Sequence, residues 1–234
     1  MAQQINPISF RLGKTQVWND ILQVYGKSYS KYFLILYKCL QIRNILIRFF
    51  FNNKFLLHLQ EWKFYKNKIF LNIYYSYLSN DQKQNFLNLS SKITKLISQW
   101  LFGKVIIYFY FIPQKNYTTE ILSTYAFYLL EKNVSPKRLI QNLCYFLKFN
   151  LCSEKISYFK FGLLRLHLKG FKIQLTGRFN NSKSQMSLKI NQAVGVLPLT
   201  QLKSSIEYTN TEIYTKSGIC GLQIWLFYEI QNKK

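Results

Sequence analysis

The stretch near the C-terminus, residues 170–227, constrains the fold of this chain more than any other. Apolar residues such as Phe171, Ile173 and Leu175 alternate there with polar ones. A period of two over this length is typical of strands with one buried face. Glycine, asparagine and proline residues divide the stretch. The four predicted strands are 171–179, 184–192, 202–214 and 219–228.

The solvent side of this predicted sheet is strongly basic. No carboxylate occurs between Glu154 and Glu207. The whole chain shares the imbalance, because 32 Lys and Arg against 9 Asp and Glu give a net charge of +23. Cations gathered on one face without anions are the electrostatic footprint of a polyanion-binding protein. The cations predicted on this face are Lys169, Lys172, Arg178, Lys183, Lys189, Lys203 and Lys216.

Mutual repulsion among these charges destabilises a free protein, so an anionic partner is expected. Nucleic acid is the first candidate, and an anionic membrane surface is the second. Lys38, Arg43 and Lys104 interrupt the two most apolar runs, residues 32–51 and 100–113. Neither run offers eighteen uncharged apolar residues, so no membrane insertion is predicted.

The composition also indicates where the chain is made. It has 20 Phe and 18 Tyr but only 9 Gly and 4 Pro, which is a bias toward AT-rich codons. Such a bias fits an organelle genome and equally an AT-rich parasite or symbiont. The first ten residues resemble neither a secretory signal nor a transit peptide, as expected for synthesis inside the compartment of use.

The other elements are predicted from helical spacing, caps and strand-forming content. Ser135 and Pro136 are a preferred N-cap and a preferred first helical residue. Residues 150–169 are interpreted as a strand-like or irregular linker. The predicted helices are 19–38, 81–101, 119–132 and 136–149, and the predicted strands before the C-terminal sheet are 44–51, 67–77 and 105–112.

The sequence contains no constellation of catalytic groups. Its nine acidic residues are scattered, and no two lie three or four positions apart. General acid–base catalysis and metal-dependent nuclease chemistry both need clustered carboxylates. The four cysteines form no C-x-x-C pair and have no metal-ligand spacing to His58 or His167. We therefore expect no enzyme activity, no metal site and no cofactor.

Two cations begin the helix predicted at 136–149. Lys137 and Arg138 oppose the helix macrodipole in its first turn, which costs a few tenths of a kcal/mol. Binding of phosphate would explain their presence. Two solvated charges on an exposed turn are the alternative interpretation.

Three motifs follow one another along the chain. The first comprises Gln3, Asn6, Pro7, Arg11, Leu12 and Gly13, the second Gly170, Lys172, Thr176, Gly177 and Arg178, and the third Pro198, Leu199, Leu202, Ile206, Glu207, Tyr208, Thr215, Gly218, Gly221 and Trp225. In this order and at these distances they resemble the universal third protein of the small ribosomal subunit. The middle of the chain resembles that family only in element order.

The resemblance implies an α+β fold. It comprises an N-terminal arm over 1–15, a type II KH domain over 16–117, and a C-terminal domain of two helices on a four-stranded sheet over 118–234. A KH domain grips single-stranded nucleic acid with a G-x-x-G loop, where a Cβ would block the backbone. No glycine lies between Gly26 and Gly103. We therefore expect a degenerate KH domain and a mitochondrial member of the family, encoded in the organelle.

The resemblance also implies a function. Such a protein is a structural constituent of the small-subunit head, with small-subunit rRNA and neighbouring head proteins as partners, and it lines the channel through which mRNA enters. Lys137 and Arg138 would face the mRNA, although the next basic position of the family falls on Gln141. The alternatives are a free organellar RNA-processing factor and, more weakly, a basic membrane-surface protein. The candidate rRNA-binding residues are Arg11, Lys14, Lys169, Lys172, Arg178, Lys183 and Lys189.

Overall fold

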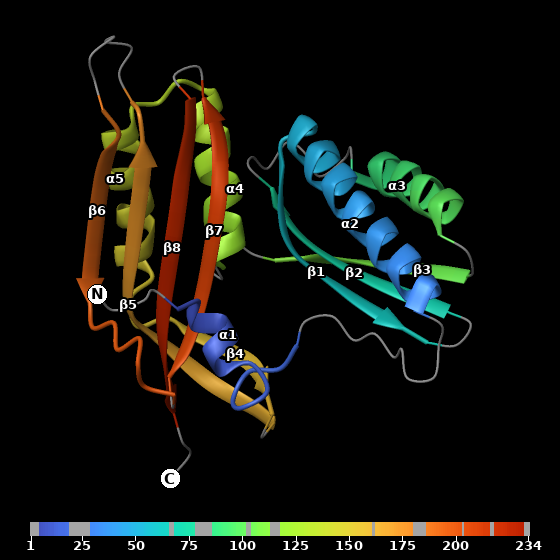
Figure 1. Ribbon diagram of the computed structural model, residues 1–234, viewed down its shortest axis with the longest axis horizontal. Coiled ribbons are helices and arrows are strands. Elements are labelled where there is room, and N and C mark those ends of the chain that lie inside the picture. The colour runs from blue at the N-terminus through green and yellow to red at the C-terminus, as the bar shows by residue number, and fades with distance from the viewer. Residues whose placement is uncertain are drawn as a thin grey trace. The chain divides into compact units, whose positions relative to one another are not determined.

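The chain divides into two compact units, which are each described separately (Figure 1). One contains Asn19–Gln114 and is called the three-stranded unit; the other contains Met1–Trp18 and Lys115–Lys234 and is called the five-stranded unit. The structure is a computed structural model. It describes residues 5–18, 29–65, 68–77, 86–101, 104–112, 118–160, 162–179, 186–202, 204–215 and 218–231.

The three-stranded unit is a mixed sheet with two helices. Its sheet has the order β1-β2-β3, in which β1 and β2 are antiparallel and β2 and β3 are parallel. A bulge interrupts β1 between Leu57 and Gln60. The elements in chain order are α2 (Tyr29–Asn52), β1 (Phe55–Phe64), β2 (Lys68–Tyr77), α3 (Phe86–Trp100) and β3 (Lys104–Phe111).

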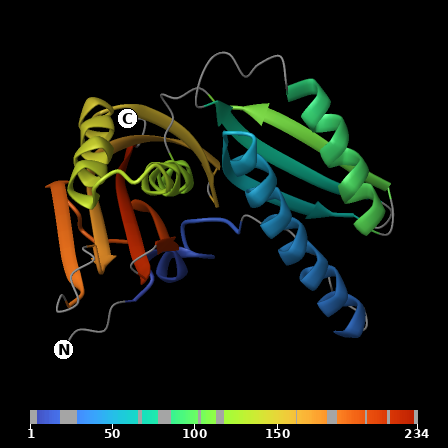
Figure 2. The same ribbon diagram turned by 90° about the horizontal axis from the view of Figure 1, so that it is seen from above.

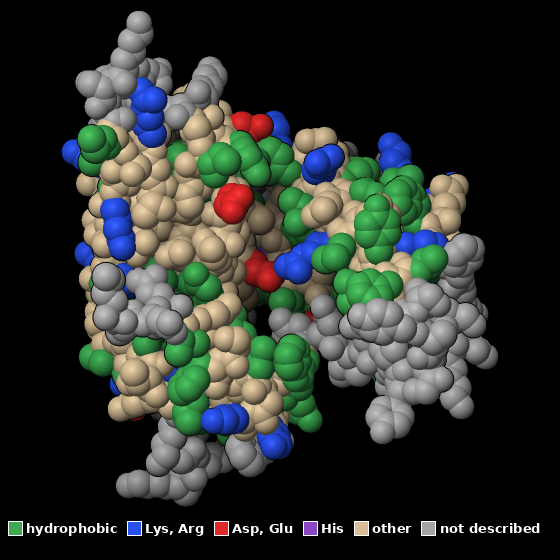
Figure 3. All heavy atoms as spheres, in the orientation of Figure 1, with side chains coloured by type: hydrophobic (Ala, Val, Ile, Leu, Met, Phe, Trp, Pro, Cys, Tyr) green, Lys and Arg blue, Asp and Glu red, His purple; other side chains and the backbone are tan. Residues whose placement is uncertain are grey.

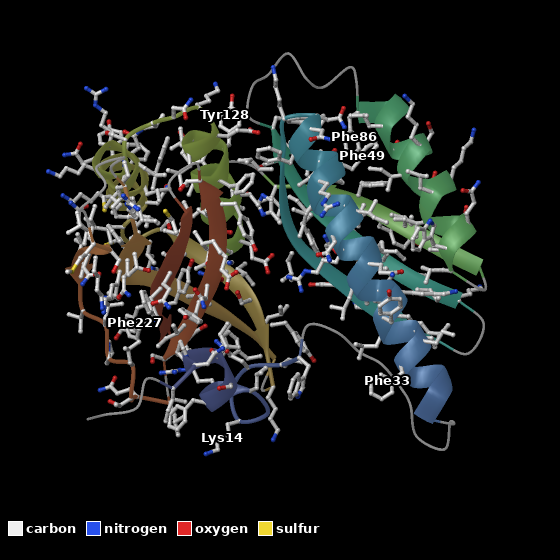
Figure 4. The ribbon with its side chains drawn as sticks, turned by 45° about the horizontal axis from the view of Figure 1, so that its top comes forward. Lys14, Phe33, Phe49, Phe86, Tyr128 and Phe227 are labelled. Carbon is white, nitrogen blue, oxygen red and sulfur yellow. The ribbon has the colours of Figure 1, made fainter. Side chains whose placement is uncertain are left out.

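Both helices of this unit pack on one face of its sheet. Leu71 and Ile73 of β2 are completely buried in a cluster that includes residues of α2 and α3. Phe86, at the start of α3, stacks on the ring of Tyr75 with 4.1 Å between centroids. Phe86 and Phe49 of α2 both lie on this helix-covered side (Figure 4).

The strand predicted at 44–51 is wrong, because these residues form the second half of α2. Ile42, Leu46 and Phe50 are buried four residues apart, which is helical spacing. Strand-forming residue types outweighed this period in the prediction, since the segment is rich in β-branched and aromatic side chains. The strand β1 that follows was not predicted.

The five-stranded unit is an antiparallel sheet with two helices on one face. α4 contacts β7 and β8, and α5 contacts β5 and β6. The short helix α1 lies on the opposite face, as Figures 1 and 2 both show. Its elements are α1 (Pro7–Arg11), α4 (Thr119–Glu131), α5 (Pro136–Phe149), β4 (Glu154–Phe159), β5 (Gly162–Gly177), β6 (Leu188–Gly195), β7 (Ser205–Thr215) and β8 (Gly218–Gln231).

The sheet has five strands, so the prediction of four is corrected. The strand order is β4-β5-β8-β7, and β6 also pairs with β5. β4 pairs with the first half of β5 and β6 with the second half, along the edge that β8 leaves open. The predicted linker at 150–169 is therefore β4 and the start of β5. Leu164, Leu166 and Leu168 alternate there with polar residues, and a bulge interrupts β5 between Leu168 and Gly170.

Two glycines allow the chain after β6 to pass close to this bulge. A Cβ added at Gly170 would lie 2.6 Å from the carbonyl oxygen of Val196. One added at Gly195 would lie 2.2 Å from the carbonyl oxygen of Lys169, and Gly195 has a φ of +79°. Any larger residue would push the two backbones apart. This close approach of the two backbones explains why the second sequence motif has glycine at position 170.

Candidate nucleic-acid interface

The face of the five-stranded sheet that α4 and α5 leave open carries part of the predicted basic surface. Residues paired across neighbouring strands share a face. Lys172 pairs with Ala193 on one side and Trp225 on the other, and Trp225 pairs with Tyr208. Four residues further along β5, Thr176 pairs with Lys189. Lys172 and Lys189 therefore lie on the same open face.

A compact cation–aromatic cluster occupies the middle of this open face. The Nζ of Lys172 lies 5.0 Å from the ring centroid of Trp225. The rings of Tyr208 and Trp225 are 5.2 Å apart, and burial raises the pKa of the Tyr208 hydroxyl. Cation–π contact holds the ammonium over the indole while leaving it half-exposed. The cluster fixes one positive charge at a defined place on the sheet.

The charges on this face are unevenly distributed. Figure 3 shows Lys and Arg side chains along the β6 edge, whereas acidic side chains lie toward β7. The pairing agrees, because Glu212 of β7 lies across from Gly221, in the row of Lys189. The basic footprint predicted for the whole face is thus concentrated on β5 and β6.

The remaining predicted cations of the sheet lie in different environments. Lys169 lies at the β5 bulge, and its Nζ is 3.1 Å from a carboxylate oxygen of Glu229. Arg178 follows the end of β5 and is half-buried. Three others, Lys183, Lys203 and Lys216, lie outside the described residues.

Arg11 is not available to bind RNA, so its prediction is corrected. Its side chain is completely buried. The guanidinium donates to the carbonyl oxygens of Pro7, Leu199, Gln201 and Ser204 at 2.7–3.0 Å. Burial lowers the pKa of its guanidinium from the ordinary value. Arg11 therefore ties the N-terminal arm to the segment before β7.

The first sequence motif is thus a docking device for the arm. Asn6 caps α1 by accepting a hydrogen bond from the Ile8 amide at 3.0 Å, and Pro7 occupies the first turn. Gln16 donates to the carbonyl oxygen of Ile206 at 3.1 Å. Lys14 stays exposed on the outside of this arm (Figure 4). Of the two cations predicted in the arm, Lys14 alone can meet a partner.

Lys137 and Arg138 lie in the first turn of α5, and both side chains are exposed. Ser135 makes no side-chain cap bond, and Pro136 begins the helix. The buried residues of this helix face the sheet, so its outer side is free within the five-stranded unit. They are Leu139, Ile140, Leu143, Cys144 and Leu147.

The outer side of α5 also carries two exposed rings that the sequence analysis missed. Tyr145 is 73% exposed and Phe149 is 82% exposed. Both lie close to the line of Arg138, seven and eleven residues further on, which is a helical repeat. That spacing was readable in the sequence, but the buried stripe of the same helix dominated its interpretation.

The described residues contain no candidate metal site. No three His, Cys, Asp or Glu side chains gather in the part of the chain that the structure describes. Burial raises the pKa of the Cys144 thiol, and that thiol contacts Gln192. None of the described helices is both long and apolar enough to cross a membrane. Fold and surface together define a basic α+β protein.

Comparison with known proteins gives the family. No protein-family profile matches the chain. The small ribosomal subunit protein uS3m of Chondrus crispus is 47% identical over 228 residues, which are 97% of this chain and 94% of that protein. The uS3 protein of Carsonella ruddii is 29% identical over the whole of both chains. That of Pelagibacter ubique is 22% identical over 97% of this chain and 90% of its own.

The chain belongs to the uS3 family of small ribosomal subunit proteins. The resemblance predicted from the three motifs is confirmed, as is the mitochondrial type, since the relative from Chondrus crispus is the mitochondrial form. The chain is a structural ribosomal protein and not an enzyme. The α+β fold agrees with this membership.

Proposed function

We propose that the chain binds small-subunit rRNA through the β5–β6 side of the open face, in the head of the mitochondrial small subunit. The observation that carries this role is the placement of Lys172 and Lys189 on one face of two neighbouring strands. Glu154, the first residue of β4, is the last carboxylate before Glu207 of β7. Phosphates can therefore approach β5 and β6 with little competition from anions of these strands.

Lys14 and Arg178 complete the proposed rRNA contact, and Lys183 remains a predicted contact outside the described residues. Lys169 contributes less, because its ammonium is already paired with Glu229. Contacts of this kind recognise backbone charge and shape rather than base sequence. Neighbouring head proteins are the second class of partner.

In the proposed assembly Lys137 and Arg138 help to form the channel through which mRNA enters. Both are exposed, and both lie on a helix whose other side is fixed by the core. Because the core fixes this helix, the two charges would keep a constant position beside the mRNA that passes them. Gln141, one turn on, adds no charge, so the cationic cluster is small.

The three-stranded unit is proposed to be a degenerate type II KH domain. Support comes from its element order, helix–strand–strand–helix–strand, and from its mixed sheet. The position expected for the G-x-x-G loop, 77–83, is largely outside the described residues and contains no glycine. This unit would therefore lack the usual backbone grip on nucleic acid.

Sedimentation tests the ribosomal role against the free-factor alternative. Mitochondrial extract is separated on a sucrose gradient, and the chain is detected with an antibody. Comigration with the small subunit in buffer of moderate salt is expected. A chain that stays at the top of the gradient, apart from rRNA, would show that it acts off the ribosome.

A further inference from the structure

The three-stranded sheet has an outer face that its own helices do not cover. Leu71, Ile73 and Tyr75 of β2 point to the helices and are buried. Because side chains alternate along a strand, Phe70, Asn72 and Tyr74 point the other way. The register adds residues of the neighbouring strands to this outer face. They are Glu61, Lys63, Ile106, Tyr108 and Tyr110.

This outer face is rich in aromatic rings. Phe70 and Tyr108 are stacked at an angle of 6° with 6.3 Å between ring centroids. Tyr74 and Tyr110 are stacked with 5.1 Å between theirs. Tyr65, just beyond β1, meets Phe70 edge-on at 5.4 Å. Outer faces of solvated sheets normally carry polar residues, so five rings together require a reason.

Four of the five rings, those of Tyr65, Phe70, Tyr108 and Tyr110, line an open hollow. Tyr65, Tyr108 and Tyr110 are 62%, 45% and 44% exposed. The hollow has a volume of about 750 Å³, and its other lining residues include Lys63, Lys68 and Asn72. This volume is within the usual range for small-molecule sites, so it has room for nucleobases. The lysines are placed to neutralise phosphates beside them.

The charge of this face favours an anionic occupant. Glu61 is the one carboxylate among the described residues of the three-stranded unit. Its Oε2 accepts hydrogen bonds from Asn72 and Tyr74, both at 3.4 Å, and so is turned toward the sheet. Lysine is depleted in protein–protein interfaces, whereas rings flanked by lysines are typical of single-strand binding surfaces.

We infer that this face, the aromatic platform (Tyr65, Phe70, Tyr74, Tyr108 and Tyr110), binds unpaired nucleotides of RNA by stacking, with Lys63 and Lys68 on their phosphates. Every base has a π-face, so such binding tolerates any sequence. The platform belongs to the three-stranded unit and does not use the open face of the other sheet. It would give this unit an RNA contact without a G-x-x-G loop.

The test uses the purified full-length chain and fluorescein-labelled twelve-nucleotide oligouridine, with an RNA duplex of the same length as the reference ligand. Anisotropy is measured at about 0.3 M salt, where the general attraction between this basic chain and RNA is reduced. The double variant Y108L/Y110L keeps apolar side chains and removes two rings. Y37L, which removes an exposed tyrosine of α2, is the matched control.

Y108L/Y110L is expected to lower affinity for the single strand at least tenfold, because two surfaces on which bases stack are removed, and to leave duplex affinity within twofold. Y37L should change neither. A second variant, K63Q/K68Q, should weaken single-strand binding and reduce its salt dependence by about one phosphate contact per lysine. Unchanged circular dichroism confirms that each variant is folded.

Unchanged single-strand affinity in both folded double variants would overturn the inference. So would equal losses for single strand and duplex, since stacking on splayed bases does not act on a duplex. If Y108L/Y110L instead releases a ribosomal protein from the small subunit and binds oligouridine normally, the platform is a protein contact. Loss of duplex binding by variants of Lys172 and Lys189 concerns only the other sheet, so the two roles can fail separately.

Discussion

The two units place helices on one face of a sheet but treat the other face differently. In the three-stranded unit the outer face carries rings stacked in pairs, with Lys63 and Lys68 beside them. In the five-stranded unit it is mostly polar, with a cation–aromatic cluster around Trp225. A flat ring matches a base, whereas an isolated ammonium matches a phosphate. The difference suggests two modes of RNA contact within one chain.

The largest expected effect tests whether the two cores are separate. Leu71 and Leu222 are each completely buried, in different clusters. L71A and L222A should each lower the free energy of unfolding of their own unit by about 4 kcal/mol, because each leaves a cavity. Hydrogen exchange should rise in β2 for the first and in β8 for the second. Equal loss of protection in both units would show a single cooperative core.

Removal of the Arg11 side chain should detach the N-terminal arm from the segment before β7. R11A leaves the carbonyl oxygens of Leu199, Gln201 and Ser204 without their donor, which should destabilise the five-stranded unit by about 3 kcal/mol. Urea denaturation measures this loss, and limited proteolysis should cut the arm first. K14A, in the same arm, is the control and should be nearly neutral. Equal destabilisation by R11A and K14A would contradict the proposal that Arg11 holds the arm in place.

Much of the fold was predictable, because several segments have one dominant period. The helices predicted at 119–132 and 136–149 are confirmed as α4 and α5, and the strands at 67–77 and 105–112 as β2 and β3. The boundaries of the C-terminal strands were less accurate, since bulges and long strand ends leave no clear pattern. At 44–51 the helical period competed with strand-forming residue types, and the residue types led to the wrong prediction.

The candidate site was less predictable than the fold. The burial of Arg11 depends on carbonyl groups almost two hundred positions away, which no local pattern reveals. The aromatic residues of β2 and β3 were evident in the sequence, but the face of the sheet on which each ring lies was not. Both strands are apolar on each side, so alternation alone did not show which rings lie under α2 and α3. Strand register supplied that information.

Removal of positive charges from the open face of the five-stranded sheet should weaken rRNA binding strongly. K172Q/K189Q removes the two cations that share the open face, and each should reduce the salt dependence of rRNA binding by about one phosphate contact. At 0.1 M salt this is a loss of about a hundredfold in affinity. K169Q is the matched control on the same strand and should lose far less. Filter binding over a salt series measures both.

A smaller effect is expected at the mRNA. K137Q/R138Q removes two exposed charges from α5, and mRNA affinity of reconstituted small subunits should fall about fivefold. K148Q, at the other end of the same helix, is the control. If both variants behave alike, α5 contributes general charge rather than a specific contact with the mRNA.

The smallest effect concerns pH. Burial, and then the Glu61 carboxylate, raise the pKa of Tyr74 from its ordinary 10.0 to about 12. A raised folded-state pKa stabilises the fold fully below about pH 10, and this stabilisation is lost as pH rises toward 12. Y74F should therefore flatten the decline of unfolding free energy between about pH 10 and 12. An unchanged slope would show that Tyr74 is not buried against Glu61.

The central claim is that open sheet faces of this chain meet RNA in the small ribosomal subunit. A density map of mitochondrial small subunits purified with this chain tests it most directly. The account predicts rRNA backbone against Lys172 and Lys189, and an unpaired base on Tyr108 or Tyr110. Density for protein over both faces, or solvent over both, would contradict it.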